Sequence, residues 1–544
     1  MAEKQLGVSR EEWAWITIAS ALLLLAASAP YLVGLLSSTP ELQFGGFVFG
    51  LDDMHSYLAK MRFGARAGPF FELVYTHEPQ DSGGLVFLFH QGLGWLTGLI
   101  TGERALVSAG ALIVAYHAAR VVCGFLLLLV MYRFIASYLP ERSLRRLAWA
   151  LAALASGLDW TLLLFQGADL APEPLALYVP EAFTFLSLMG LPHLLLARAL
   201  LLSGWLAFFR SLEGQRVRCA LLAGLAWLGM GLLVPFYVAL LGILIAAWLG
   251  ARWVIERRFP AQPLVAAILA TLLPVVLLLY NTWLFTSNPI YAAWSAQNTL
   301  PSPPPGVYAL AFGPLFLLAL PGAVRLARAG LTRRATLLIA WPMIALLLVY
   351  APINVQRRLL EGVIVPLAVL AAAGVSSLAG EQVRVRSLRG AGLTLMLVML
   401  LPSTLLLDFG SVLAAAHPAA PIFLTPGELA ALDYMRLTAP MDSVVLSTND
   451  SGSLLPAYAG VRVYVGHGPE TLNGAHKRET AMHFFGPEMT DSERAALLKD
   501  IHAAYVWVGP LERALCPGTC LNLDELGLRP VYNQGDYTIF KVGR

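Results

Sequence analysis

The sequence predicts a polytopic α-helical membrane protein with a water-soluble α/β domain at its carboxyl end. Of its 544 residues, 58% are hydrophobic and only 13% are charged, whereas roughly a quarter of the residues in a soluble domain are charged. The mean hydropathy is +0.67. Apolar stretches of about 20 residues, the length that crosses a hydrocarbon core, recur up to about residue 408. The chain therefore divides into a membrane module and a soluble tail.

These apolar stretches predict about 11 transmembrane helices. They lie near residues 14–36, 106–133, 147–166, 185–209, 219–233, 235–251, 263–285, 307–324, 335–351, 360–379 and 391–407. Ala27-Ser28-Ala29 in the first stretch is similar to a signal-peptidase site, but Pro30 follows at once and the apolar run continues, which favours an uncleaved anchor. The net charge of +3 is too small to indicate a nucleic-acid partner.

An unequal distribution of basic residues predicts the orientation in the membrane. Alternate loops carry most of the lysines and arginines before residue 408, among them Arg142, Arg145, Arg146, Arg216, Arg218, Arg333 and Arg334. Cytoplasmic loops are enriched in such residues. We therefore expect a cytoplasmic amino terminus, a long external first loop over 37–105 and an extracytoplasmic carboxyl-terminal region.

The tail, residues 409–544, has the pattern of a small α/β domain behind the membrane module of residues 1–408. Capping boxes predict helices that begin after Thr425 and Thr490. Short β-rich runs and a hairpin complete the pattern, at residues 443–447, 461–465, 504–508 and 530–542.

Two further segments of the tail bear on function. The loop 466–471 lacks the glycine spacing of a nucleotide site, so a packing or lid role is favoured over a contribution to an active site. Cys516 and Cys520 are expected to form a local disulfide, because the tail faces the oxidising side of the membrane.

Asp52 and Asp53 are the most informative residues, because they follow the first apolar stretch directly in a chain that otherwise avoids charge. Adjacent carboxylates at a membrane surface suit a general base or a divalent cation such as Mg²⁺ or Mn²⁺. The alternative is structural: an aspartate here can cap the helix that follows. We expect at least one of the two to act in catalysis or metal binding.

Four neighbours in the first loop are candidate substrate-binding residues. His55 and Tyr57 follow the aspartates, and the apolar spacing after Tyr57 predicts an amphipathic helix at the membrane interface. His77 and Glu78 lie in a Tyr-Thr-His-Glu-Pro run, which also fits an ordinary turn.

Two other loops contribute the remaining candidates. Trp294 and Gln297 lie in an external loop where aromatic residues alternate with amides, as in a sugar-binding lid, although membrane-surface tryptophan is also a common anchor. Gln356, Arg357 and Arg358 begin an external loop against the charge trend. Guanidinium groups suit phosphate recognition, and a surface salt bridge or lipid contact is the alternative.

The acidic pair after the first span, the runs at 75–79, 192–193 and 356–358, and the external α/β tail together resemble a bacterial branch of the glycosyltransferase C superfamily. That resemblance implies a membrane enzyme of the cytoplasmic (inner) membrane that uses a polyprenyl-phosphate-linked sugar as donor. It implies that Asp52 or Asp53 stands at the catalytic or metal-binding acid, and that Arg357 and Arg358 hold donor phosphate. The Trp-Trp-Asp-Tyr-Gly motif of oligosaccharyltransferases is absent, which argues against transfer to asparagine.

The function expected from these features is transfer of a sugar to a glycan, lipid or protein acceptor on the outer face of the bilayer, with an aspartate as general base and inversion at the anomeric carbon. The alternatives are a transporter or flippase of a lipid-linked glycan, which predicts charges deep in several spans and inverted repeats, and a structural membrane subunit.

Overall fold

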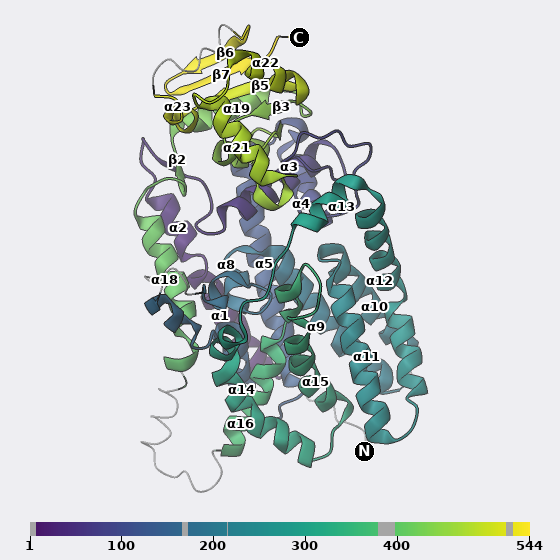
Figure 1. Ribbon diagram of the computed structural model, residues 1–544. Helices are drawn as coiled ribbons and strands as arrows, with labels where there is room; N and C mark the ends of the chain where they lie inside the picture. The colour runs from purple at the N-terminus through teal and green to yellow at the C-terminus, as the bar shows by residue number, and fades with distance from the viewer. Residues whose placement is uncertain are drawn as a thin grey trace. The chain divides into compact units, whose positions relative to one another are not determined.

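The computed structural model describes residues 7–165, 172–214, 216–378, 396, 398–517 and 526–543 (Figure 1). The chain forms two compact units. The helical unit consists of Met1–Ala29, Ala118–Trp283 and Thr299–Gly410. The sheet unit consists of Pro30–His117, Leu284–Asn298 and Ser411–Arg544. The boundary at residue 408 and the outward orientation of the tail stay predictions.

The helical unit is built mostly from apolar helices of varied length. They are α1 (Arg10–Ala26), α5 (Ala109–Ala136), α6 (Arg142–Leu154), α8 (Thr184–Gly190), α9 (Pro192–Leu212), α10 (Val217–Leu233), α11 (Tyr237–Glu256), α12 (Ala261–Ser287), α14 (Pro305–Arg328), α15 (Arg333–Leu348), α16 (Ile364–Leu378) and α18 (Pro402–Ala416), with a short α7 (Leu175–Tyr178). The 3₁₀ segments η2 (Asp159–Phe165) and η3 (Gln356–Leu360) lie between them. Helices α5, α12 and α18 each have part of their residues in the sheet unit.

Six helices of the described chain are long and apolar enough to cross a bilayer, or seven if α1 and the bent continuation α2 (Ala29–Leu36) count as one span. A polytopic helical protein is thereby supported, but the expected count of 11 is not confirmed. Several expected spans are shorter helices, such as α10. The expected span at 185–209 is broken before Pro192, which begins α9, because proline is favoured at a helix start and disfavoured inside a helix.

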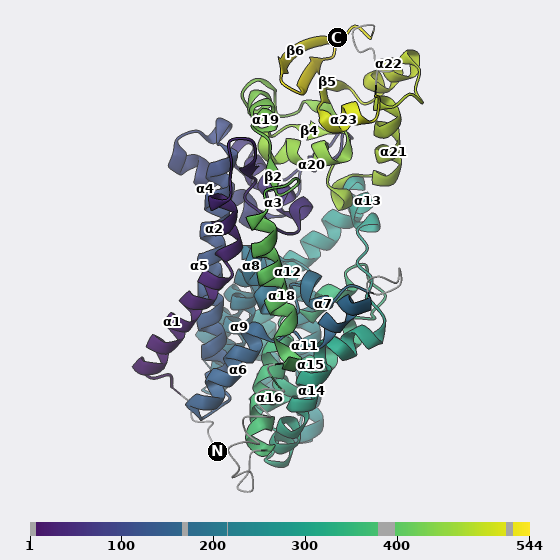
Figure 2. The same cartoon turned by 90° about the vertical axis from the view of Figure 1, so that its left-hand side faces the viewer.

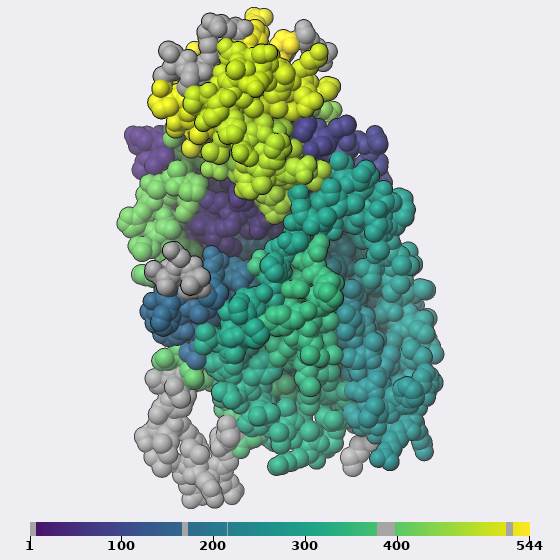
Figure 3. Space-filling view, in the orientation of Figure 1, coloured from purple at the N-terminus to yellow at the C-terminus, as the bar shows by residue number. Residues whose placement is uncertain are grey.

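The outer face of α12 is apolar, as a lipid-facing helix requires. Its large exposed side chains are apolar: Val265, Ile268, Leu272, Leu273, Val275, Val276, Leu279 and Trp283. This helix appears in teal along the right-hand side of Figures 1 and 3. A contiguous apolar surface of this kind is uncommon on a soluble protein, so it fits a helix that contacts lipid.

The sheet unit contains a mixed five-stranded sheet in the order β4-β3-β5-β7-β6. The strands are β3 (Val444–Leu446), β4 (Arg462–Val463), β5 (Ala503–Val508), β6 (Arg529–Gln534) and β7 (Tyr537–Lys541). β3 pairs in parallel with β4 and β5, and β7 pairs antiparallel with β5 and β6. The expected strands and hairpin of the tail are therefore present.

Helices cover this sheet: α19 (Pro426–Thr438), α20 (Asn449–Tyr458), α21 (Gly474–Phe485), α22 (Asp491–Asp500) and α23 (Pro510–Ala514). The capping prediction is confirmed, because the Thr425 hydroxyl accepts the Glu428 N–H and Thr490 and Glu493 form a full capping box. Cys516 is disulfide-bonded, and its expected partner Cys520 lies outside the described residues.

The first loop folds as part of the sheet unit. It contributes β1 (Gln43–Phe44), which pairs with β2 (Phe423–Leu424), and the helices α3 (Leu51–Arg66), α4 (Leu88–Thr101) and η1 (Arg104–Leu106). The segment Leu284–Asn298 adds α13 (Pro289–Gln297). α3 packs against α4 and α20, and Figure 2 shows it beside both.

The expected interfacial helix in this loop is wrong in one respect. α3 is buried along nearly its whole length, from Met54 to Ala65 except Tyr57, rather than lying with one face in a membrane surface. Close packing against α4 explains this burial: a side-chain carbon at Gly94 would lie 1.7 Å from the carbonyl oxygen of Met61. Glycine at this crossing lets the two backbones touch.

Candidate functional site

Asp52 and Asp53 lie in the first turn of α3 and are exposed. The helix begins at Leu51 with Gly50 as its N-cap residue in a left-handed conformation, φ 55°, so neither aspartate occupies the N-cap position. Carboxylates in a first turn interact favourably with the positive end of the helix dipole. The sequence thus places two anionic groups at the solvent end of a buried helix.

The two aspartates contact different partners, both from the tail. The Ser453 hydroxyl at α20 donates to Asp52 Oδ1 at 3.0 Å. His467 Nε2 lies 3.2 Å from Asp53 Oδ1. The Asp53 side chain is 63% exposed, whereas that of His467 is 6% exposed. Asp53 therefore presents one side of its carboxylate to solvent while a buried imidazole holds the other side.

A buried ion pair supports His467 from behind. Its Nδ1 lies 3.7 Å from Glu470 Oε1, and the same Glu470 oxygen accepts hydrogen bonds from Ser56 at 2.7 Å and from Lys60 at 2.5 Å. Burial pushes the pKa of Glu470 upward, but the charges of Lys60 and His467 and these hydrogen bonds hold it below its ordinary value. Glu470 is therefore a buried carboxylate that stays ionised.

His55 is buried in α3, whereas Tyr57, one helical turn after Asp53, is partly exposed. Burial, together with the charge of His467, lowers the pKa of His55 to about 4, so its imidazole is neutral near pH 7. Tyr57 stacks on His90 with ring centroids 4.5 Å apart. The described contacts of both residues are with the protein interior.

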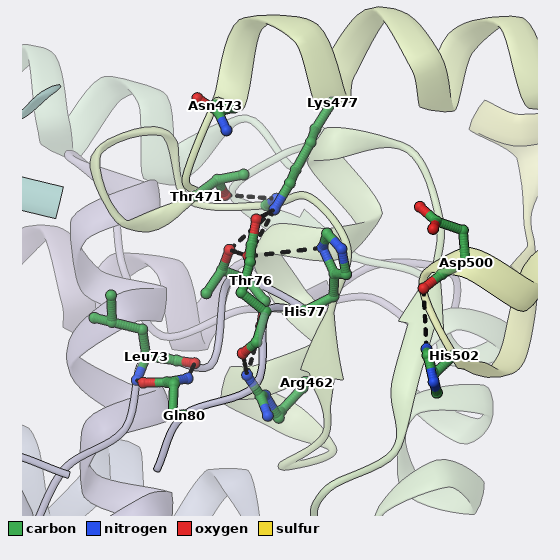
Figure 4. A network of polar contacts seen from close by, with 12 residues as sticks. Leu73, Thr76, His77, Gln80, Arg462, Thr471, Asn473, Lys477, Asp500 and His502 are labelled. Carbon is green, nitrogen blue, oxygen red and sulfur yellow. Dashed lines mark hydrogen bonds and ion pairs between the residues drawn. The ribbon is translucent and has the colours of Figure 1, made fainter. Parts of the chain in front are cut away.

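His77 and Glu78 belong to a polar network between the first loop and the tail (Figure 4). Lys477 of α21 donates to Glu78 at 2.7 Å and to Thr76 at 3.0 Å, and Arg462 donates to the Glu78 carbonyl oxygen at 2.6 Å. Burial pushes the pKa of Glu78 upward, but bonds from Lys477 and Thr76 bring it below its ordinary value. The Glu78 carboxylate is thus occupied by an ion pair.

α13 positions Trp294 and Gln297 differently. Trp294 is buried and packs against Phe87 and Phe285. Gln297 donates to the carbonyl oxygens of Pro469 and Thr471 at 3.0 and 2.8 Å, and accepts from the Asn473 N–H at 3.3 Å. Gln297 therefore ties down the loop that carries His467 and Glu470.

Gln356, Arg357 and Arg358 lie in η3 of the helical unit. The Gln356 side chain bonds to the backbone of Ser302 and Ala351. The Arg357 guanidinium lies 4.9 Å from the ring centroid of Tyr178. Arg358 lies 3.5 Å from Glu181 with 37% of its side chain exposed. Both arginines thus have protein partners.

The nearby Glu361 does not pair with these arginines in any described contact. It is fully buried and binds Arg198 at 2.6 Å and the Tyr237 hydroxyl at 2.6 Å. This buried acid satisfies an arginine inside the helical unit.

Sequence reasoning missed His467, Glu470 and Lys60. The loop 466–471 was interpreted as packing because it lacks a nucleotide pattern, yet it carries two buried ionisable groups. A histidine and a glutamate three residues apart in a glycine-rich loop were the available signal. Their partner Lys60 is 410 positions away, a distance at which pattern reasoning does not identify pairs.

A divalent cation at Asp52 and Asp53 stays a prediction. Among the described residues, no group of three or more His, Cys, Asp or Glu side chains is arranged to hold a metal ion. Mg²⁺ is often held by one or two carboxylates together with substrate phosphates.

No protein-family model matches the chain, and no curated protein is similar to it in sequence. Its fold is similar to that of an oligosaccharyltransferase from Archaeoglobus fulgidus. The structure with a tethered acceptor peptide matches at 15% identity and TM-score 0.54, over 91% of this chain and 69% of that one. The apo form matches at 14% identity and TM-score 0.54, over 92% and 70%.

ArnT from Cupriavidus metallidurans is also similar, at 15% identity over 98% of this chain and 99% of that one, with a TM-score of 0.48. At such identities the likeness concerns the fold alone. The chain is similar in fold to the archaeal oligosaccharyltransferase.

Proposed function

We propose that the protein is a membrane glycosyltransferase that moves a sugar from a polyprenyl-phosphate-linked donor to an acceptor hydroxyl, with Asp53 as general base. One observation carries this proposal: an exposed carboxylate, held from behind by a buried histidine, at the end of a helix in a chain of this fold. A general base needs an ionised group with open access to the acceptor and a fixed orientation.

Asp53 is favoured over Asp52 because of the group that orients it. His467 Nε2 lies within hydrogen-bonding distance of Asp53 Oδ1, and a proton on that nitrogen would let the buried imidazole hold the carboxylate in a fixed orientation. The partner of Asp52 is a serine hydroxyl. Glu470, which is paired with Lys60, packs behind the imidazole at 3.7 Å from its Nδ1.

The reaction then balances without a further reactant. Asp53 takes the proton of the acceptor hydroxyl as its oxygen forms a bond to the anomeric carbon of the donor sugar. The bond from that carbon to the lipid phosphate breaks, and the phosphate leaves with the electron pair. Attack opposite the leaving group inverts the anomeric centre. The proton on Asp53 is released to water after the product departs.

We assign Arg357 and Arg358 the separate role of binding the donor phosphate. Arg358 is partly exposed and lies 3.5 Å from Glu181, and guanidinium groups bind phosphate oxygens through two parallel hydrogen bonds. His77 and Glu78 are assigned no contact with substrate, because their network is an internal ion pair.

The acceptor is proposed to carry a hydroxyl, as a glycan, a lipid or a protein side chain. The archaeal enzyme of similar fold is an oligosaccharyltransferase whose acceptor peptide contains an NVT sequon. Trp-Trp-Asp-Tyr-Gly does not occur in this sequence, and this absence supports an acceptor other than asparagine.

The decisive experiment compares Asp53→Asn, Asp52→Asn and a control, Asp81→Asn, which removes an exposed carboxylate elsewhere in the first loop. Each full-length variant is assayed in detergent with a radiolabelled polyprenyl-phosphate sugar and a panel of hydroxyl acceptors. Asp53→Asn is expected to lower the transfer rate about 10²- to 10⁴-fold, with parental thermal stability. Asp52→Asn is expected to lose less, and Asp81→Asn nothing.

Transfer by Asp53→Asn at the parental rate would overturn the assignment of the base. Movement of labelled lipid across proteoliposome membranes without any transfer, in parent and variants alike, would overturn the enzymatic proposal and favour a flippase.

A further inference from the structure

The helical unit contains a cavity that plays no part in the proposed transfer. Its volume is about 300 Å³. Three arginines line it: Arg133 near the end of α5, Arg210 near the end of α9 and Arg334 in the first turn of α15. Aliphatic side chains of α14, α15 and α16 form much of the remaining wall. A cavity with a cationic rim and apolar sides fits an amphipathic anion.

The charges around the cavity are mostly of one sign. Repulsion from Arg210, Arg334 and Arg145 acts on Arg133. Glu213 accepts from Arg334 at 2.6 Å, and Arg145 is engaged with Glu12 at 2.8 Å. Arg133, Arg210 and Arg334 nevertheless line the same space. An anion placed among three guanidinium groups in a partly desolvated site interacts favourably with all of them.

The backbone adds to the positive potential. α15 begins beside the cavity with Thr332 as its N-cap residue, and the Thr332 hydroxyl accepts the Ala335 N–H. The amino-terminal end of a helix is the positive end of its dipole. Arg333 and Arg334 occupy the first turn, where acidic residues are normally favoured. Both the dipole and these side chains therefore favour an anion in the adjoining space.

We propose that this cavity binds a phosphate group, supplied either by the headgroup of an anionic phospholipid or by free phosphate. The planar guanidinium group binds phosphate oxygens through two parallel hydrogen bonds. Basic pockets between transmembrane helices on the cytoplasmic side bind anionic headgroups, and the basic loops predict that side for the ends of α5 and α9. The apolar wall would accept the first part of an acyl chain.

The test measures ligand-induced stabilisation of the full-length protein in detergent with three probes: phosphatidylglycerol, phosphatidylcholine and inorganic phosphate. The variants are Arg210→Gln and the double change Arg133→Gln with Arg210→Gln. Arg210→Lys keeps the charge. The matched control is Arg218→Gln, which removes an exposed arginine of the same set of loops that does not line the cavity.

Phosphatidylglycerol, inorganic phosphate or both are expected to raise the unfolding temperature, and phosphatidylcholine is not. The apparent Kd should rise about 10- to 100-fold in the glutamine variants and stay near the parental value in Arg210→Lys and Arg218→Gln. A response to phosphatidylglycerol alone identifies a lipid headgroup, and a response to inorganic phosphate identifies a phosphate site that needs no lipid.

Equal stabilisation of the parent and the glutamine variants by every probe, or no stabilisation by any of them, overturns the proposal. Should the double variant fail to fold, Arg210→Gln decides alone, because this side chain is exposed and its removal leaves the core intact.

Discussion

Two acidic groups in the sheet unit contact the tail in opposite ways. At α3, Asp53 meets a buried histidine and is still 63% exposed. In the loop between α3 and α4, the Glu78 carboxylate binds Lys477 and Thr76, and its side chain is 26% exposed. Both acids stand out in the sequence for the same reason, a charge in an apolar chain. Asp53 is the more exposed of the two, so it is the one that a substrate can reach more readily.

The difference indicates that a carboxylate is a candidate general base when its neighbours fix its orientation without neutralising its charge. A lysine ammonium neutralises Glu78 and makes it part of the packing between loop and tail. A histidine behind Asp53 fixes the carboxylate and leaves its charge available. The four predictions that follow test this contrast, from the largest expected effect to the smallest.

Removing Lys477, the cation that pairs with Glu78, should lower the free energy of unfolding and leave the transfer activity unchanged. Lys477→Met leaves the partly buried Glu78 without its partner, at an expected cost of about 3 kcal/mol. Thermal unfolding followed by tryptophan fluorescence measures the change, and Lys499→Met, an exposed position on α22, is the control. The specific activity of the folded fraction should match the parent; a large loss of kcat there would place this network in the site after all.

Acidification should lower the stability of the folded protein through His55, a buried residue of α3. The pKa of His55 is about 4 in the folded protein against about 6.5 in an unfolded chain. Between pH 4 and pH 6.5, His55 is therefore protonated in the unfolded chain and neutral in the folded protein. Stability is fully present above pH 6.5 and falls as the pH drops toward 4, by up to about 3 kcal/mol.

His55→Phe should flatten this part of the stability–pH curve, whereas substitution of the exposed His476 by glutamine should not. Parallel curves for the parent and His55→Phe would show that His55 is not the responsible group.

Loss of the imidazole behind Asp53 should slow transfer without removing the base. His467→Gln is expected to lower kcat about 100-fold through misorientation of the carboxylate, with an unchanged KM for the donor. The pH profile of kcat should also shift, because the group that contacts the Asp53 carboxylate changes. A loss of stability alone, with parental kcat and pH profile, would reduce His467 to a packing residue.

Loosening the loop that carries His467 should give the smallest effect. Gln297→Ala removes three hydrogen bonds to residues 469–473, each worth about 1 kcal/mol at most in a partly exposed setting. We expect a loss of activity below about 10-fold and faster amide hydrogen exchange in residues 467–473. Unchanged exchange would show that other contacts hold the loop.

The sequence predicts well what depends on neighbouring residues. Helices such as α12 and α14 begin and end within a few residues of the expected positions because hydropathy is a local property, and the capping box at Thr490 is a pattern of four residues. The span expected at 391–407 lies partly outside the described residues. Whether an apolar helix crosses the bilayer is harder, because α10, α15 and α16 are all shorter than a full span, and packing decides how such helices are used.

The sequence predicts the two aspartates of the candidate site but not the residues that contact them. Asp52 and Asp53 are visible as adjacent charges, but the residues that distinguish them, Ser453 and His467, follow about 400 positions later in a region with the pattern of an independent domain. The apolar spacing after Tyr57 leaves Lys60 off the apolar face of the expected amphipathic helix. Lys60 is buried because α3 is covered by α4 and α20, a tertiary fact that no local periodicity contains.

The contact of Gly94 with the Met61 carbonyl oxygen has a consequence for how this protein tolerates variation. Even an alanine at position 94 would have to displace α3, the helix that carries both aspartates. A scan of all substitutions scored by activity would therefore rank Gly94 among the most sensitive positions, although it touches neither acid. In such data, residues that set the distance between two helices would look the same as residues that handle a proton, and only a structure separates them.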